Sequence, residues 1–211
     1  MESIALTNPH HEDCVEAAAT LLLPLYAEPH RAYHNAAHVH ALLRLADAHA
    51  DLMRDPLAIR LAIWFHDAVY DTALQDNEER SACLAAQTLS DWHCDGALIA
   101  SVVSKIRATA GHRWEDGDPD TALFLDFDLS VLAAPEAVYD RYAQQIAQEY
   151  GWVPQAAYQA GRTEVLQGFL RRPHLYFTEC LRAQWEARAR VNLQRELHSL
   201  TEAQGDGDWS R

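Results

Sequence analysis

The sequence has few basic residues and no long apolar run, and each shortage argues against a class of function. Its 211 residues include 17 Lys and Arg against 31 Asp and Glu, which gives a net charge of −14 at pH 7. Binding along a nucleic-acid backbone requires clustered basic side chains, so we expect no coat of DNA or RNA. No segment approaches the roughly 18–20 apolar residues that a membrane-spanning helix needs. We therefore expect no membrane partner.

Paired cysteines and targeting signals are also scarce. The segment MESIALTNPHHEDC lacks the basic stretch and apolar core that are typical of a secretory signal. The cysteines are far apart and none belongs to a CxxC pair; they are Cys14, Cys83, Cys94 and Cys180. We expect four reduced thiols in a cytoplasmic protein.

Strand signals are weak as well, because no hairpin dipeptide lies between alternating segments. Apolar residues instead recur at helical spacing along nearly the whole chain. The pattern predicts helices over residues 12–26, 35–53, 57–69, 76–92, 95–110, 123–132, 135–150, 154–170 and 178–202. The expected fold class is all-α: one compact bundle of eight or nine helices over residues 1–205, with a frayed tail at 206–211.

Two helix starts are marked by local chemistry. Asp55–Pro56 combines an N-cap residue with a proline at the first helical position. Asp76 to Glu79 has the D-x-x-E form of a capping box. Residues 111–120 contain one Pro, two Gly and four acidic residues, which predicts a surface loop.

Histidines lie next to carboxylates in otherwise apolar sequence. His34 and His38 are four residues apart at the start of an expected helix, so both imidazoles can face one pocket. His66–Asp67 lies near the end of an apolar helix, where burial is costly unless both groups find partners. A divalent cation satisfies both at once, because it binds neutral imidazole nitrogen and carboxylate oxygen.

A third polar group, Asp126 and Asp128, lies in the apolar run 125–130. Each group alone is common by chance, because a single helical histidine is usually packed or solvated and a D-x-D at a helix start usually caps it. The ordered combination on successive helices favours a metal site.

The order His38, His66–Asp67, Asp128 resembles the HD superfamily of metal-dependent phosphohydrolases. A closer similarity is to a subgroup of bacterial HD proteins described as predicted phosphohydrolases. It covers nearly the whole chain and rests on RAYHNAAHV, LAIWFHDAVYD, DNEERSA, IRATAGH, FLDFDLSVL, YDRYAQQIAQEY, GRTEVLQGFL and EARARVNLQREL. The resemblance implies that His38, His66, Asp67 and Asp128 hold one divalent ion (Mn, Fe, Ni, Zn, Co or Mg), with a second ion as an alternative. It also implies hydrolysis of a small phosphorylated metabolite, with nucleotides as the first class to consider, and leaves the oligomeric state open.

YHNAAHVHAL is also similar to the YHNxxH segment of cyclic-nucleotide phosphodiesterases, which belong to the same superfamily. This similarity implies that His34 is the general acid that protonates the leaving oxygen. The DLS at 128–130 is similar to the segment around their distal ligand, which favours Asp128 over Asp126. Asp67 is expected to orient or deprotonate the attacking water. Those enzymes carry another histidine shortly after HD, and residues 68–76 contain none, so we expect no two-metal cyclic-nucleotide hydrolase.

Six further side chains are considered as contacts to a second ion, a bound water or the substrate: His112, Asp126, Glu78, Glu79, Arg31 and Arg162. Most have a structural alternative. His112 is an ordinary loop residue in that alternative, and Glu79 completes the capping box. The two arginines form salt bridges between helices. Two other functions stay open. One is a helical protein that binds metal and nucleotide without turnover. The other is a diiron oxygenase in which His112 or His93 serves a second iron.

Overall fold

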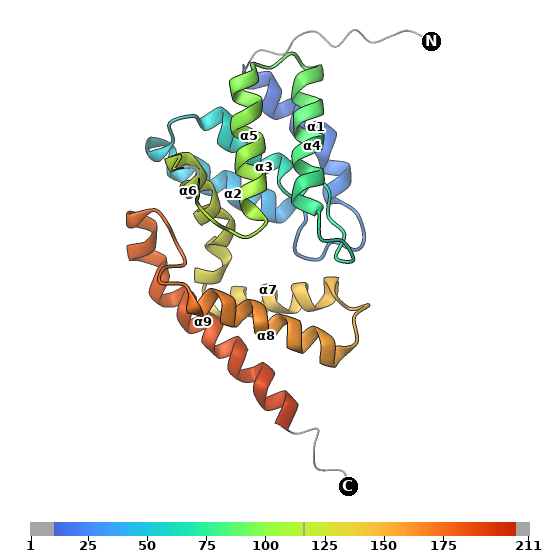
Figure 1. The fold of residues 1–211 in the computed structure, drawn as a ribbon, viewed down its shortest axis with the longest axis vertical. Helices are drawn as coiled ribbons and strands as arrows, with labels where there is room; N and C mark the ends of the chain where they lie inside the picture. Colours follow the sequence, from blue (N-terminus) through green and yellow to red (C-terminus); the bar gives the residue numbers. More distant parts are fainter. Residues whose placement is uncertain (1–10, 116, 206–211) are drawn as a thin grey trace. The chain divides into compact units, whose positions relative to one another are not determined.

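The computed structural model describes residues 11–115 and 117–205, and helices are the only regular elements within them (Figure 1). The expected all-α class is therefore confirmed for this part of the chain. The chain forms two compact units, residues 1–127 and 128–211. The single domain expected over residues 1–205 stays a prediction, and the frayed tail expected at 206–211 lies outside the described residues. None of the described helices combines the length and apolar composition that crossing a membrane requires.

The first unit is arranged around a short apolar helix. Its elements are α1 (His11–Tyr26), α2 (Ala36–Ala48), the 3-10 helix η1 (Ala50–Leu52), α3 (Pro56–Phe65), α4 (Asn77–Asp91), α5 (Gly96–Thr109) and α6 (Pro119–Asp128). The helix α3 packs against α1, α2, α4 and α5 (Figure 1). Its sequence LAIRLAIWF leaves almost no polar face, and its aliphatic and aromatic side chains other than that of Leu57 are buried, as that composition predicts.

The start of α3 is fixed by two carboxylates. Asp55 is the N-cap, and its side chain accepts a hydrogen bond from the backbone N–H of Ala58 at 3.0 Å. Pro56 follows at the first helical position, so this predicted helix start is confirmed. The buried Asp120 carboxylate accepts hydrogen bonds from the backbone N–H groups of Arg54 and Asp55, at 3.0 and 2.7 Å. This contact ties the beginning of α6 to the beginning of α3.

Several helix boundaries and one cap differ from the predictions. The helix α2 ends at Ala48 instead of residue 53, and the 3-10 helix η1 follows it. The helix α3 ends at Phe65 instead of residue 69. The helix α6 begins at Pro119 instead of residue 123, because the Asp118 carboxylate accepts hydrogen bonds from the backbone N–H of Asp120 and the hydroxyl of Thr121. The capping box at the start of α4 is wrong. Asp76 is the N-cap residue but makes no side-chain cap bond.

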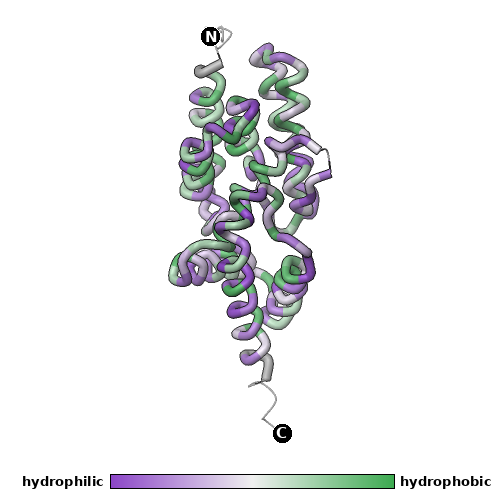
Figure 2. Tube along the Cα trace, turned by 90° about the vertical axis from the view of Figure 1, so that its left-hand side faces the viewer, coloured by the Kyte–Doolittle hydropathy of each residue, from purple (hydrophilic) through white to green (hydrophobic). Residues whose placement is uncertain are grey.

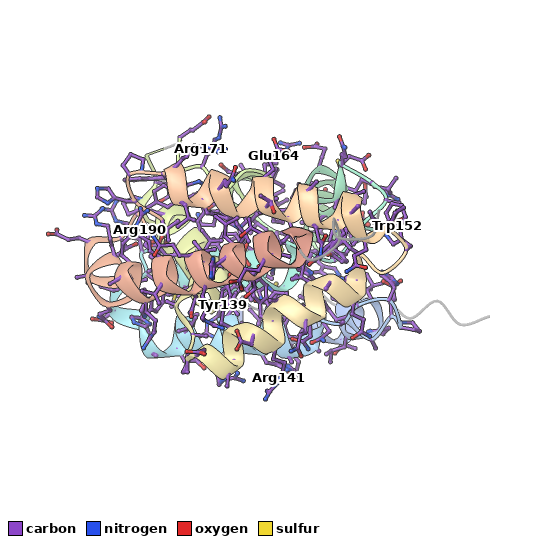
Figure 3. The ribbon with its side chains drawn as sticks, turned by 90° about the horizontal axis from the view of Figure 1, so that it is seen from below. Tyr139, Arg141, Trp152, Glu164, Arg171 and Arg190 are labelled. Atoms are coloured by element: carbon purple, nitrogen blue, oxygen red, sulfur yellow. The ribbon has the colours of Figure 1, made fainter. Side chains whose placement is uncertain are left out.

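The second unit contains the 3-10 helix η2 (Leu129–Ala133) and the helices α7 (Glu136–Glu149), α8 (Gln155–Arg171) and α9 (Glu179–Gly205). Figure 3 shows the three α-helices side by side, with Tyr139 of α7 facing α9. The core of this unit consists of Leu129, Leu132, Ala133, Tyr139, Leu166, Leu175, Tyr176, Ala189 and Leu193. Along most described helices, hydrophobic and hydrophilic residues alternate around the axis, as expected for helices with one buried face (Figure 2).

Candidate metal centre

The first part of the candidate site lies at the N-terminus of α2. Asn35 is the N-cap, and its side chain accepts from the backbone N–H of Ala37 at 2.8 Å while donating to the carbonyl of Ala32 at 2.8 Å. This cap turns the YHN segment into the helix at the position that the sequence predicts. His38 then falls in the first turn on the buried face of α2 and is only 5% exposed.

The second part lies where α3 ends. His66 is the C-cap residue, and its backbone N–H still bonds to the carbonyl of Ala62 at 2.9 Å. Its side chain is buried, whereas the Asp67 side chain that follows is 16% exposed. The C-terminal end of α3 therefore places a buried imidazole next to a partly accessible carboxylate.

The ligand atoms of His38, His66 and Asp67 converge. The two Nε2 atoms of His38 and His66 are 3.1 Å apart. The Oδ2 atom of Asp67 lies 3.0 Å from Nε2 of His66 and 3.8 Å from Nε2 of His38. Among the described residues these three form a group in which all ligand atoms lie within 4.8 Å of one another. The structure thus brings together three of the four metal ligands that the resemblance implies.

A hydrogen bond at Nδ1 of His66, on the side of the ring away from Asp67, determines which ring nitrogen has a free lone pair. Nδ1 of His66 lies 2.9 Å from the carbonyl oxygen of Ile63, and a carbonyl can only accept. Nδ1 therefore carries a proton, and in the neutral ring Nε2 presents its lone pair to the carboxylate of Asp67 and to Nε2 of His38. Lone pairs that face one another at about 3 Å repel unless a hydrogen-bonding proton, such as one on Nε2 of His38, or a metal ion lies between them. A backbone carbonyl that fixes the tautomer in this way is the usual support of a metal-binding histidine.

The donor set fits a divalent transition metal. Two imidazole nitrogens and one carboxylate oxygen suit Zn, Fe, Co, Ni or Mn better than Mg, which prefers oxygen ligands. Three protein donors also leave coordination positions open for water and substrate, which is the arrangement of catalytic sites rather than structural ones.

His34 lies beside this group. Its imidazole ring is stacked on the ring of Tyr70, with centroids 4.2 Å apart and planes inclined by 30°. It meets the ring of His38 edge-on at 6.0 Å and the ring of Tyr33 edge-on at 5.0 Å. The position next to a metal-ligand candidate is compatible with the acid role that the resemblance implies. Tyr70 is a site residue that sequence reasoning missed, and its only signal was its place three residues after the His-Asp pair.

Arg31 is buried under the same segments. Its side chain is 1% exposed, and its guanidinium donates to the carbonyls of Asp67 at 2.6 Å, of His34 at 3.2 Å and of Ala68 at 3.0 Å. The Nε atom donates to the carboxylate of Glu28 at 3.0 Å. The ion pair of Arg31 is therefore local, and it is not the salt bridge between helices that was the alternative to a phosphate clamp. A contact of Arg31 with a phosphate stays a prediction.

The acidic residues on α4 were considered as contacts to a metal-bound water. Both carboxylate oxygens of Glu79 accept from Arg107 of α5, at 2.6 and 2.7 Å. This hydrogen bond lowers the pKa of Glu79 and also explains why the residue does not complete a capping box. Glu78 is half-buried in the first turn of α4. A role for either side chain near the metal stays a prediction.

The remaining candidates lie in different surroundings. Asp126 is fully buried within α6, and Asp128 is the last residue of α6 and the first of the second unit. His112 follows α5 with a positive φ of 46°. Arg162 belongs to the second unit, where its guanidinium pairs with Glu196 at 2.7 Å, which matches the helix-to-helix salt bridge. The contribution of these residues to the site stays a prediction.

Comparison of the chain with protein-family models, curated proteins and solved structures found no match.

Proposed function

We propose that the protein is a metal-dependent phosphohydrolase, that is, a phosphoric ester hydrolase acting on a small phosphorylated metabolite, with nucleotides as the first class to test. The observation that carries the proposal is the convergence of Nε2 of His38, Nε2 of His66 and Oδ2 of Asp67, with the His66 tautomer held by a carbonyl. The resemblance of the motifs to the HD superfamily supports the reaction class.

Each residue at the site has a distinct proposed role. His38, His66 and Asp67 hold the ion, which when bound supplies Lewis acidity toward the phosphoryl oxygens and lowers the pKa of a bound water. The partly accessible carboxylate of Asp67 orients the attacking water. His34, in its protonated form, donates a proton to the leaving oxygen, because an unperturbed imidazole titrates near pH 6.5.

Asp128 is the proposed fourth ligand, and the resemblance supports it over Asp126, because the DLS at 128–130 is similar to the segment around the distal ligand of the cyclic-nucleotide phosphodiesterases.

The test is hydrolysis by metal-loaded protein. The apo protein is loaded in turn with Mn, Fe, Co, Ni, Zn and Mg and assayed for release of phosphate or nucleoside from nucleotides and phosphomonoesters. We expect turnover with at least one metal, and loss of turnover and of metal binding in Asp67→Ala. His38→Ala should behave in the same way, whereas the matched control His40→Ala, on the exposed side of the same helix, should retain both.

Two outcomes would overturn the proposal in different ways. Tight binding of a metal and a nucleotide without product under any metal would support the non-catalytic alternative. Two irons per chain, with oxidation of a substrate at the expense of dioxygen, would support the oxygenase alternative.

A further inference from the structure

Arg31 joins the two chain segments that carry the metal-ligand candidates. One segment is the YHN loop, whose His34 carbonyl accepts from Nη1 of Arg31 at 3.2 Å. The other is the turn after α3, where the carbonyl of Asp67 accepts from Nη1 at 2.6 Å and that of Ala68 from Nη2 at 3.0 Å. Three backbone acceptors from two segments therefore share one planar cation.

The burial of Arg31 shows that these contacts are structural constraints. Its side chain is 1% exposed, and the one carboxylate bonded to it, that of Glu28, is 40% exposed. The positive charge is therefore balanced largely by carbonyl dipoles and by the faces of two tyrosine rings. The Cζ atom of Arg31 lies 5.2 Å from the ring centroid of Tyr26 and 5.5 Å from that of Tyr70. Moving the guanidinium would leave several buried polar groups without partners, which is costly.

Tyr70 links this cation to His34. The Tyr70 ring contacts the Arg31 guanidinium and is stacked on the His34 imidazole at 4.2 Å. The backbone of Tyr70 is held in turn, because Nε2 of His30 lies 2.9 Å from its carbonyl oxygen. The orientation of the His34 ring thus depends on a side chain from the turn that carries Asp67.

We propose that Arg31 and Tyr70 are positioning residues: Arg31 sets the distance between the YHN loop and the His66–Asp67 turn, and Tyr70 sets the orientation of the His34 imidazole. The effect on turnover rests on the proposed hydrolysis, whereas the effect of Arg31 on metal binding rests only on the proposed metal centre of His38, His66 and Asp67. A lysine cannot reproduce this set of bonds, because its three donors lie on one nitrogen, whereas Arg31 donates from Nε, Nη1 and Nη2 in a fixed planar arrangement.

The Arg31 part is tested with Co²⁺ alone as the probe, by titration followed in the visible absorption spectrum. Arg31→Lys should weaken Co²⁺ binding by about tenfold, the lower end of the effect of residues that orient metal ligands. The matched control is Arg60→Lys on α3, where the arginine makes one exposed ion pair with Asp47. It should change the affinity less than about twofold. Co²⁺ affinity in Arg31→Lys within twofold of the unaltered protein would overturn this part.

The Tyr70 part is tested by a pair of substitutions and by separating kcat from KM. Tyr70→Leu removes the ring and should lower kcat roughly tenfold on the best substrate of the nucleotide panel, with KM and Co²⁺ affinity nearly unchanged. Tyr70→Phe keeps the ring and should restore kcat. Equal kcat values for Tyr70→Leu and the unaltered protein, or equal losses in both variants, would overturn the role of the ring.

The outcomes separate this proposal from the proposed function. An unaltered protein that hydrolyses no phosphate ester contradicts the proposed function and the role of Tyr70, while the Co²⁺ titration still decides the role of Arg31. Should Arg31→Lys fail to fold by circular dichroism, the specific positioning role of Arg31 is overturned in favour of a general structural role, and the Tyr70 pair still decides the role of the ring.

Discussion

Two histidines, His93 and His112, occupy backbone positions that usually belong to glycine. His93 has a φ of 57° and His112 a φ of 46°. After α4, the N–H of Cys94 bonds to the carbonyl of Leu89 and the N–H of His93 to that of Ser90. This pair of bonds defines a Schellman motif, with His93 at the left-handed position that ends the helix. The backbone role accounts for His93 without any metal.

Replacing His93 by glycine should stabilise the protein. A left-handed conformation costs an L-residue roughly 1–2 kcal/mol, and the greater freedom of glycine in the unfolded chain costs roughly 0.4–1 kcal/mol. The expected gain for His93→Gly in the free energy of unfolding is therefore about 0.5–1 kcal/mol, measured by urea denaturation. His93→Ala keeps the strained backbone and serves as the control. A glycine variant that loses a bound iron would instead support the oxygenase alternative.

Asp118 gives the stability a defined pH dependence. Burial acts to raise its pKa, but hydrogen bonds from the Lys105 ammonium and the backbone N–H of Asp120, with the lysine charge, lower the pKa below its usual value of 3.8. A carboxyl whose pKa is lower in the folded state stabilises the fold above the unfolded pKa. It loses that contribution as pH falls through the folded pKa.

Asp118→Asn should therefore be less stable than the unaltered protein at neutral pH and equally stable in acid. The expected deficit at pH 7 is about 2 kcal/mol, since Lys105 is buried and loses its partner, with allowance for screening at a carboxylate that is 38% exposed. Urea denaturation measured from pH 7 to pH 2.5 should show the two curves meeting below about pH 4. A deficit that is constant over this range would contradict the electrostatic explanation.

At the scale of elements, short-range signals were sufficient for some helix starts and not for others. Asp55–Pro56 and Asp118–Pro119 are the same dipeptide, and both begin a helix. At Asp118–Pro119 the sequence predicts a loop instead of a helix start, because the segment 111–120 contains four acidic residues and two glycines. The capping box at Asp76 failed for a different reason, because its glutamate is bonded to an arginine 28 residues away. A local sequence pattern cannot indicate that a distant arginine will bind the glutamate.

The same distinction applies to the candidate site. His38, His66 and Asp67 could be found from sequence because imidazole and carboxylate groups are rare inside apolar helices. The contacts of Arg31 could not, because its acceptors are backbone carbonyls, and every residue has one. The early end of α3 at Phe65 is linked to this arginine, since two of the carbonyls that it binds lie just beyond that point.

A buried ion pair connects α8 and α9 in the second unit. Arg162 donates to Glu196 through Nε at 2.7 Å and Nη2 at 3.0 Å, and the hydroxyl of Tyr139 donates to the same carboxylate at 2.5 Å. Burial raises the pKa of Tyr139, and the neighbouring carboxylate raises it further. Burial acts to lower the pKa of Arg162, but Tyr142 and Glu196 beside it raise the pKa overall.

Breaking this pair from one side should be costly. Glu196→Gln is expected to lower the free energy of unfolding by about 3 kcal/mol, because Arg162 keeps a buried charge without its partner. Arg162→Met combined with Glu196→Leu should cost less than the sum of the single changes, since neither charge remains. Glu202→Gln on the same helix, which breaks an exposed pair with His198, is the control and should have little effect. Additive losses in urea denaturation would contradict the coupling.

At the scale of the whole molecule, the net charge of −14 does not describe the candidate site. A divalent ion there would offset Asp67 and, if it is the fourth ligand, Asp128, so the local field need not repel a phosphate. The other carboxylates include several that are already paired, such as Glu79 with Arg107 and Asp118 with Lys105. The negative surface would still repel polyanions, which agrees with a small phosphate as the substrate.

Metal binding should stabilise one part of the molecule selectively. An ion that binds only the folded state at a free concentration 100 times its dissociation constant adds about 2.7 kcal/mol, so amide exchange in the segments that hold it should slow. We expect Co²⁺ to slow exchange in peptides covering residues 36–48 and 56–69, which carry His38, His66 and Asp67, and to leave 155–205 unchanged. EDTA should reverse the effect, and His38→Ala should abolish it. Unchanged exchange over residues 36–48 and 56–69 at saturating Co²⁺ would contradict a metal centre built from these segments.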